Sequence, residues 1–141
     1  MAYDYKTFRT VAILDEELPV GLAMNALGHS AVAVGFRTDP SWMGQTEIVD
    51  LDNQKHMGIS KYPFIILKGT KDQIKEVASK SKSLGIYTQD FTQEMIDTST
   101  DEELVESLSK KKESEIVYHG VILMGDTTKI KEITKHLSLY K

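Results

Sequence analysis

The chain has 141 residues, the length of one ordinary domain and enough to bury about two-thirds of the unfolded surface. Its hydrophobic content of 40% and charged content of 27% are typical of a soluble globular protein. It has no cysteine, which excludes disulfides, a thiolate nucleophile and a cysteine-ligated metal site. The net charge of −4 argues against a nucleic-acid partner, because such proteins usually carry a basic excess.

The beginning of the chain is polar and lacks the apolar core of a signal peptide. No apolar run is long and continuous enough to cross a bilayer. We find no internal repeat or linker either. The sequence therefore predicts a single domain over residues 1–141, located in the cytoplasm and not in a membrane.

Strand-favouring and helix-favouring segments alternate along the chain. Capping boxes at Thr70 with Gln73 and at Thr100 with Glu103 each begin a helix, and Asp126 can cap a last one. Residues 46–51 are a candidate edge strand, and residues 53–61 look irregular. Four apolar segments predict the sheet strands, at residues 8–14, 62–68, 86–91 and 116–124.

The segment at residues 18–36 reads as a helix that is apolar almost all the way round, so we expect it to be buried. Gly21, Gly28 and Gly35 recur every seven residues on one stripe, which suggests the close approach of a sheet or a ligand. Asn25 and His29 are four residues apart and therefore share one helical face. Such a polar pair needs partners or a function.

Residues 21–31 read GLAMNALGHSA, which resembles the helix G-K-I-A-A-Q-C-x-H-A-A of the peptidyl-tRNA hydrolase 2 fold, with the histidine at the same place. The closing KHLSLYK is similar to that family's H-L-x-L. The LPVG-x-A-x-N-A opening of the helix resembles more closely a group of small bacterial proteins of that fold, the DUF2000 family of unknown function. This resemblance implies a three-layer α/β/α sandwich with a four-stranded mixed sheet, whose last strand is antiparallel to the others.

Departures from the hydrolase pattern bear on activity. Leu22 stands where the hydrolases have a lysine, and Ala26 where they have a glutamine. The hydrolases' Asp-Ala-Gly-x-Thr-Gln motif is shortened here to residues 90–93. A lysine ammonium can hold a phosphate or polarise an ester carbonyl, and a leucine can do neither. Hydrolysis by the family's mechanism is therefore not expected.

His29 is the first candidate for chemistry, because its ordinary pKa near ~6.5 suits a general acid or base. It faces a cleft beside Asn25, or it is a buried histidine bonded to a carbonyl. Asp90 and Thr92 follow a strand, where open α/β sheets commonly place ligand contacts. The other histidines show no metal-ligand spacing, so we expect no metal and no cofactor.

Two functions remain open. In the first, the protein binds a small molecule or another protein at the helix of residues 21–29, with Gly21 and Asn25 contacting the ligand. In the second, it is an ester or amide hydrolase in which His29 is the general acid or base and Asp90 or Thr92 assists. The first is favoured because the family's lysine and glutamine are missing. A homodimer is compatible with both.

Overall fold

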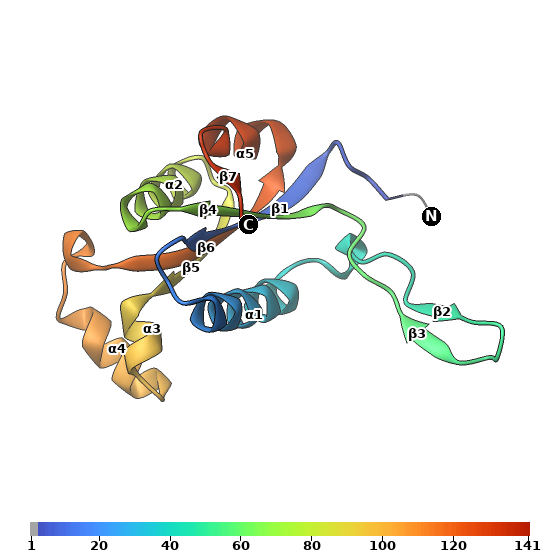
Figure 1. Cartoon of the computed structure of the whole chain (residues 1–141), viewed down its shortest axis with the longest axis horizontal. Coiled ribbons are helices and arrows are strands. Elements are labelled where there is room, and N and C mark those ends of the chain that lie inside the picture. Colours follow the sequence, from blue (N-terminus) through green and yellow to red (C-terminus); the bar gives the residue numbers. More distant parts are fainter. Residues whose placement is uncertain (1–2) are drawn as a thin grey trace.

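The computed structural model describes residues 3–141 and has a three-layer arrangement around one mixed sheet (Figure 1). The order across the sheet is β5-β6-β1-β4-β7. Only β1 and β4 form a parallel pair, and the other neighbours are antiparallel. These strands are β1 (Phe8–Asp15), β4 (Phe64–Gly69), β5 (Tyr87–Thr92), β6 (Tyr118–Asp126) and β7 (Ser138–Leu139).

The sheet has five strands, which corrects the expected four. All four segments predicted as strands are present, and β6 runs antiparallel to β1 and β5 as expected. The additional strand, β7, is two residues long and pairs with the edge of β4. It is too short to have a recognisable pattern of alternating burial, so no sequence signal marked it.

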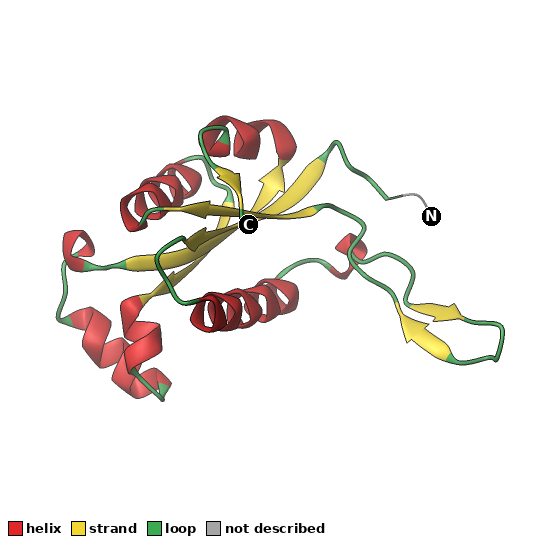
Figure 2. Ribbon diagram, in the orientation of Figure 1, coloured by secondary structure: helices red, strands yellow, loops and turns green. Residues whose placement is uncertain are grey.

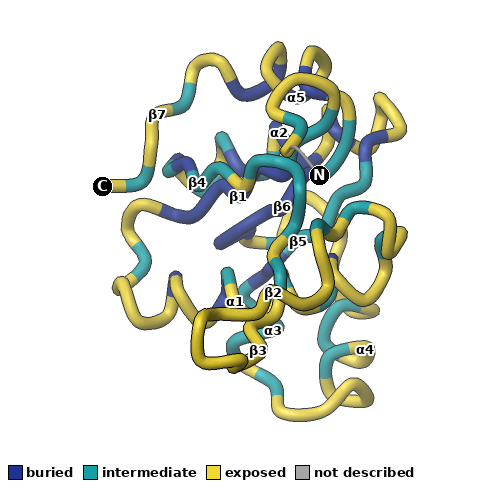
Figure 3. The backbone as a smooth tube through the Cα atoms, turned by 90° about the vertical axis from the view of Figure 1, so that its right-hand side faces the viewer, coloured by how far each residue is buried: buried dark blue, intermediate teal, exposed yellow. Residues whose placement is uncertain are grey.

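The predicted edge strand at residues 46–51 does not join this sheet. Its centre is β2 (Glu47–Val49), which pairs with β3 (Lys55–Met57) in a hairpin of its own. The segment predicted to be irregular therefore contains a strand. The hairpin projects from the body of the molecule (Figure 2), and both of its strands are exposed, in contrast to the buried β6 (Figure 3).

Two helices cover one face of the sheet and one long helix covers the other (Figure 1). Between the sheet and α2 and α5 lies the main core, which includes the fully buried Ile13, Ile74, Leu123 and Ile130. A smaller cluster, with Ala12, Val34 and Ile122, lies under the single helix α1. These three helices are α1 (Val20–Arg37), α2 (Lys71–Ser83) and α5 (Thr127–Thr134).

The helix boundaries follow the expected capping signals. The Thr70 hydroxyl accepts a hydrogen bond from the backbone N–H of Gln73, and the Gln73 side-chain carbonyl accepts one from the backbone N–H of Thr70. Gly85 follows α2 with a positive φ of 69°, a conformation that glycine adopts at little cost. The polar segment after β5 contains a short helix. It is α3 (Gln93–Asp97), followed by α4 (Asp101–Ser109).

Helix α1 is not buried all round, which corrects the expectation from its composition. The side of the helix that faces the sheet carries small residues, of which Ala23 and Ala26 are almost fully buried. Its outer side exposes large apolar residues, among them Met24, Val32 and Phe36. No atom outside the helix lies within 4 Å of a Cβ built on Gly21, Gly28 or Gly35, so the close packing inferred from the glycine stripe is absent.

Candidate functional site

A groove of about 350 Å³ lies between one flank of α1, strand β5 and the two helices that follow β5. We call it the α1 groove. Four of the residues that α1 contributes recur every four positions, which places them in a row along one helical face, and the buried Ser30 lies beside this row. The main lining residues are Asn25, His29, Ala33 and Arg37 from α1, Gln89 and Phe91 from β5, Met95 from α3 and Asp101 from α4.

Asn25 and His29 both line the α1 groove, so the sequence-predicted pair does share one site. Both residues are exposed. Neither side chain forms a hydrogen bond within residues 3–141. The alternative expectation, that His29 is buried and bonded to a carbonyl, therefore does not describe this residue. An amide and an imidazole can each donate and accept, and both groups are therefore available to a bound molecule.

The other predicted site residues do not join this pair. Asp90 alternates with Gln89 and Phe91 along β5 and so points to the opposite face of the sheet. There its carboxylate accepts a hydrogen bond from Lys82 of α2 at 3.0 Å. Thr92 is only 3% exposed and does not line the groove. Gly21 lies on α1 but outside the groove lining.

Three charged or polar groove residues were missed by the sequence reasoning. The Arg37 guanidinium donates a hydrogen bond from Nη1 to Gln89 Oε1 at 3.0 Å, which links the end of α1 to β5. Asp101 is the first residue of α4 and lies in the same groove. Arg37 continues the four-residue series of Asn25 and His29, and that spacing could have identified it. The positions of Gln89 and Asp101 depend on how β5 and α4 pack.

An ion pair with a buried carboxylate connects α3 to the residues that follow α4, the helix that forms the far wall of the groove. Glu94 of α3 is 1% exposed, and its Oε1 accepts a hydrogen bond from Lys111 Nζ at 2.6 Å. Burial raises the pKa of this carboxyl, but the Lys111 ammonium and further hydrogen bonds outweigh it and hold the pKa below its ordinary value. Lys111 thus ties the end of α4 to α3.

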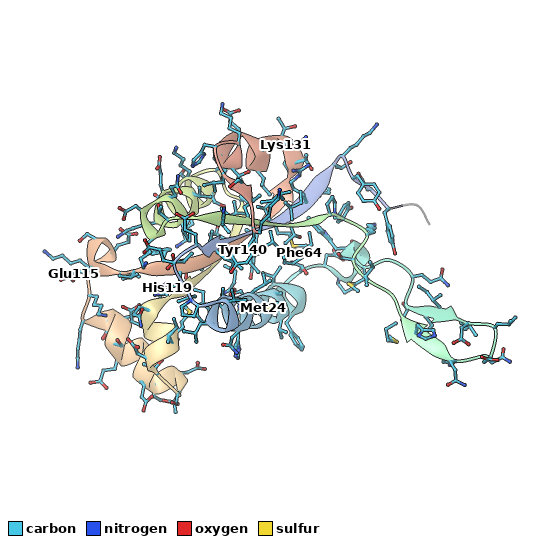
Figure 4. All side chains as sticks on the ribbon, in the orientation of Figure 1. Met24, Phe64, Glu115, His119, Lys131 and Tyr140 are labelled. Atoms are coloured by element: carbon cyan, nitrogen blue, oxygen red, sulfur yellow. The ribbon has the colours of Figure 1, made fainter. Side chains whose placement is uncertain are left out.

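A second polar cluster lies where β1 ends and β6 begins. His119 Nδ1 lies 2.8 Å from Asp15 Oδ2, and His119 Nε2 lies 2.6 Å from Gln93 Oε1 (His119 is labelled in Figure 4). Lys71 Nζ lies 3.2 Å from Asp15 Oδ2 and donates a hydrogen bond to Glu17. The cluster thus joins β1, α2, β6 and α3, the helix that contributes Met95 to the groove.

No local signal marks this cluster in the sequence. Asp15 is the first of three consecutive acidic residues, and His119 lies within a strand whose sequence does not show which face it occupies. The two meet because β1 and β6 pair with Leu14 opposite Gly120, which brings the residues beyond that pair together. Such a register is a long-range property that cannot be read from spacing.

Residues 3–141 contain no group of histidine, aspartate or glutamate side chains that could hold a metal ion. In the same part of the chain, no helix is long and apolar enough to cross a membrane. The candidate site is the α1 groove, and the Asp15–His119 cluster contacts Gln93 of α3, the helix in one of its walls.

Comparison with known proteins adds a family and a fold. Residues 8–141 match the model of a family described as "Protein of unknown function (DUF2000)". No curated protein matches the chain. A solved structure of the protein Atu0240 from Agrobacterium tumefaciens strain C58, itself described as of unknown function, is similar with a TM-score of 0.85 at 18% identity. The alignment covers 96% of this chain and 98% of that one, which shows a shared fold.

Proposed function

We infer that this chain, which belongs to the DUF2000 family, binds a small polar molecule in the α1 groove. The observation that carries this proposal is the pair Asn25 and His29, whose side chains both line the groove without a hydrogen bond in the described part of the chain. The groove volume of about 350 Å³ lies within the usual range for small-molecule sites, ~300–1,000 Å³.

The chemistry of the lining supports a small molecule with both polar and apolar parts. Phe91 and Met95 provide apolar surface, and Asn25 and His29 provide donors and acceptors to orient the ligand. This combination of apolar walls and a few convergent polar groups is typical of ligand sites. A nucleic acid fits less well, because the chain carries a net charge of −4.

The test is a titration of ¹⁵N-labelled protein with single amino acids, dipeptides and nucleosides, in which NMR measures the changes in the backbone amide chemical shifts. We expect shifts concentrated at the α1 groove, and at least ~10-fold weaker binding in Asn25→Ala, which loses one well-placed hydrogen bond. His136→Ala serves as the control, because His136 does not line the groove. Shifts that avoid α1 in every titration would contradict the proposal.

We propose as a second candidate an ester or amide hydrolase of the peptidyl-tRNA hydrolase 2 type, with His29 as general acid or base. Its support is that the His29 ring is exposed in a groove and free of internal hydrogen bonds, so it can exchange a proton with a bound molecule. Against it, Leu22 supplies no cation on α1.

Turnover of an N-acetyl-aminoacyl ester tests this second candidate. If His29 transfers the proton, His29→Ala should lose roughly 100-fold or more of the rate, the usual contribution of a general acid or base. His136→Ala should keep the wild-type rate. Equal rates in wild type and His29→Ala, or no turnover at all, would exclude this role.

A further inference from the structure

We propose that the ligand of the α1 groove is a zwitterion, an amino acid or short peptide whose carboxylate binds Arg37 and whose ammonium binds Asp101. This inference rests on the proposed binding function of the groove and goes beyond it by naming the class of ligand. It depends on two residues of opposite charge that line one groove from opposite walls, Arg37 on α1 and Asp101 on α4.

Arg37 is held in place but not neutralised. Its Nη1 donates a hydrogen bond to Gln89 Oε1, and Gln89 Nε2 in turn donates to the Asp90 carbonyl. A guanidinium has five N–H donors arranged in a planar fork, so most of them remain for a ligand. Within residues 3–141, no carboxylate pairs with Arg37. The residue is therefore a positioned cation that suits a bidentate carboxylate.

Asp101 lies in the acidic first turn of α4, where its charge favours the helix dipole, but it is not the cap of that helix. The cap of α4 is provided by its neighbours, since the Thr100 hydroxyl accepts from the Glu103 N–H and the Glu103 carboxylate accepts from the Ser99 N–H. The Asp101 carboxylate makes no hydrogen bond or ion pair in the described chain, whereas Asp15, Asp90 and Glu94 are all paired. An ammonium is a natural partner for such a carboxylate.

The two charges lie in the same groove without forming an ion pair with each other. A ligand with one charge would use only one of these two exposed groups, and a neutral ligand would use neither charge. A molecule that carries a carboxylate and an ammonium satisfies the two groups together. Phe91 and Met95 then offer apolar surface to a side chain of that ligand.

The experiment compares three forms of one probe by calorimetry: alanyl-leucine, its N-acetyl derivative and its C-terminal amide. The N-acetyl form lacks the ammonium and the amide form lacks the carboxylate. We expect alanyl-leucine to bind roughly 10-fold or more tightly than either blocked form, the effect of one charge-assisted hydrogen bond. Each blocked form thus isolates one of the two proposed contacts.

Two variants assign the contacts. In Arg37→Gln, alanyl-leucine should bind no better than its amide, and in Asp101→Asn no better than its N-acetyl form. The matched controls are Glu102→Gln, which removes the neighbouring charge at the start of α4, and Lys131→Gln on α5. Both controls should keep the full preference, because neither residue lines the groove. All four positions are exposed, so the variants are expected to fold.

The outcomes separate this inference from the proposed function. If the three forms bind equally well with shifts at Asn25 and His29, the groove binds ligands but the zwitterion is wrong. Tightest binding of a blocked form, or a preference unchanged in Arg37→Gln and Asp101→Asn, also overturns it. If none of the three forms binds, the zwitterion inference is again overturned, and the nucleoside titration decides on the groove itself.

Discussion

Asp15 is 1% exposed, and its ionised carboxylate is stabilised by groups from the turn after β1, from β6 and from α2. Burial raises its pKa, but hydrogen bonds from the Glu17 N–H, His119 and Lys71 outweigh burial, and the pKa is lowered from its ordinary value of 3.8. The folded state therefore binds fewer protons than the unfolded state near that pH. The contribution of the ionised Asp15 carboxylate to stability is fully present above pH 3.8 and is lost as the pH falls through the lowered pKa of the folded state.

Asp15→Asn tests this residue. At pH 7 we expect the free energy of unfolding to fall by about 3 kcal/mol, because Lys71 and His119 lose their buried carboxylate. The difference from wild type should shrink as the pH falls below 3.8, because Asp15 then binds a proton in the unfolded state, and the loss is complete below the lowered pKa of the folded state. Urea unfolding at a series of pH values measures both quantities.

Glu16→Gln is the control for that series, because Glu16 is the exposed neighbour outside the cluster. Its effect should stay within about 0.5 kcal/mol at every pH. Other carboxyl groups with lowered pKa values, such as Glu76 and Glu94, titrate in wild type and variants alike and cancel in the difference. A wild-type advantage over Asp15→Asn that does not change with pH would show that the charge of Asp15 is not what stabilises the cluster.

At the scale of elements, local signals identified the helices well and their environment poorly. Capping boxes and the glycine at position 85 give the limits of α2, because they act within one turn of the chain. The outer side of α1 could not be inferred in the same way. An apolar composition is compatible with a helix that is buried on all sides and with one that is buried only against the sheet. Which of the two applies to α1 depends on how the other elements pack around it.

The candidate site shows the same division. Asn25 and His29 were predicted as a pair, because helical spacing alone puts them on one face. Asp90 was expected beside them, yet strand alternation sends its side chain to the α2 face. The opposite wall, with Met95 and Asp101, belongs to helices that are joined by the ion pair of Glu94 and Lys111. Such contacts between distant segments leave no trace in local sequence.

At the scale of the whole molecule, the outer side of α1 is exposed. Helices α2 and α5 cover one face of the sheet, and α1 lies on the other face together with α3 and α4 (Figure 1). On the outer side of α1, Met24 is 64% exposed and Val32 is 60% exposed. Residues 18–36 carry no charge, so two copies of this surface meet without like-charge repulsion. The exposed Gly21, Gly28 and Gly35 lie symmetrically about Gly28, which suits an antiparallel pair. We propose that the protein forms a homodimer through this side of α1.

Sedimentation velocity measures this association directly. We expect a dimer for the wild type and a monomer for the double variant Met24→Glu and Val32→Glu, because the dimer would bury both new carboxylates without partners. Leu51→Glu is the matched control. Leu51 is 98% exposed and lies between β2 and β3. Their hairpin projects away from α1 (Figure 2), so a charge there should leave the dimer intact. A monomeric wild type, or a double variant that still dimerises, would exclude this interface. Loss of the dimer in Leu51→Glu would place the contact on the projecting hairpin instead.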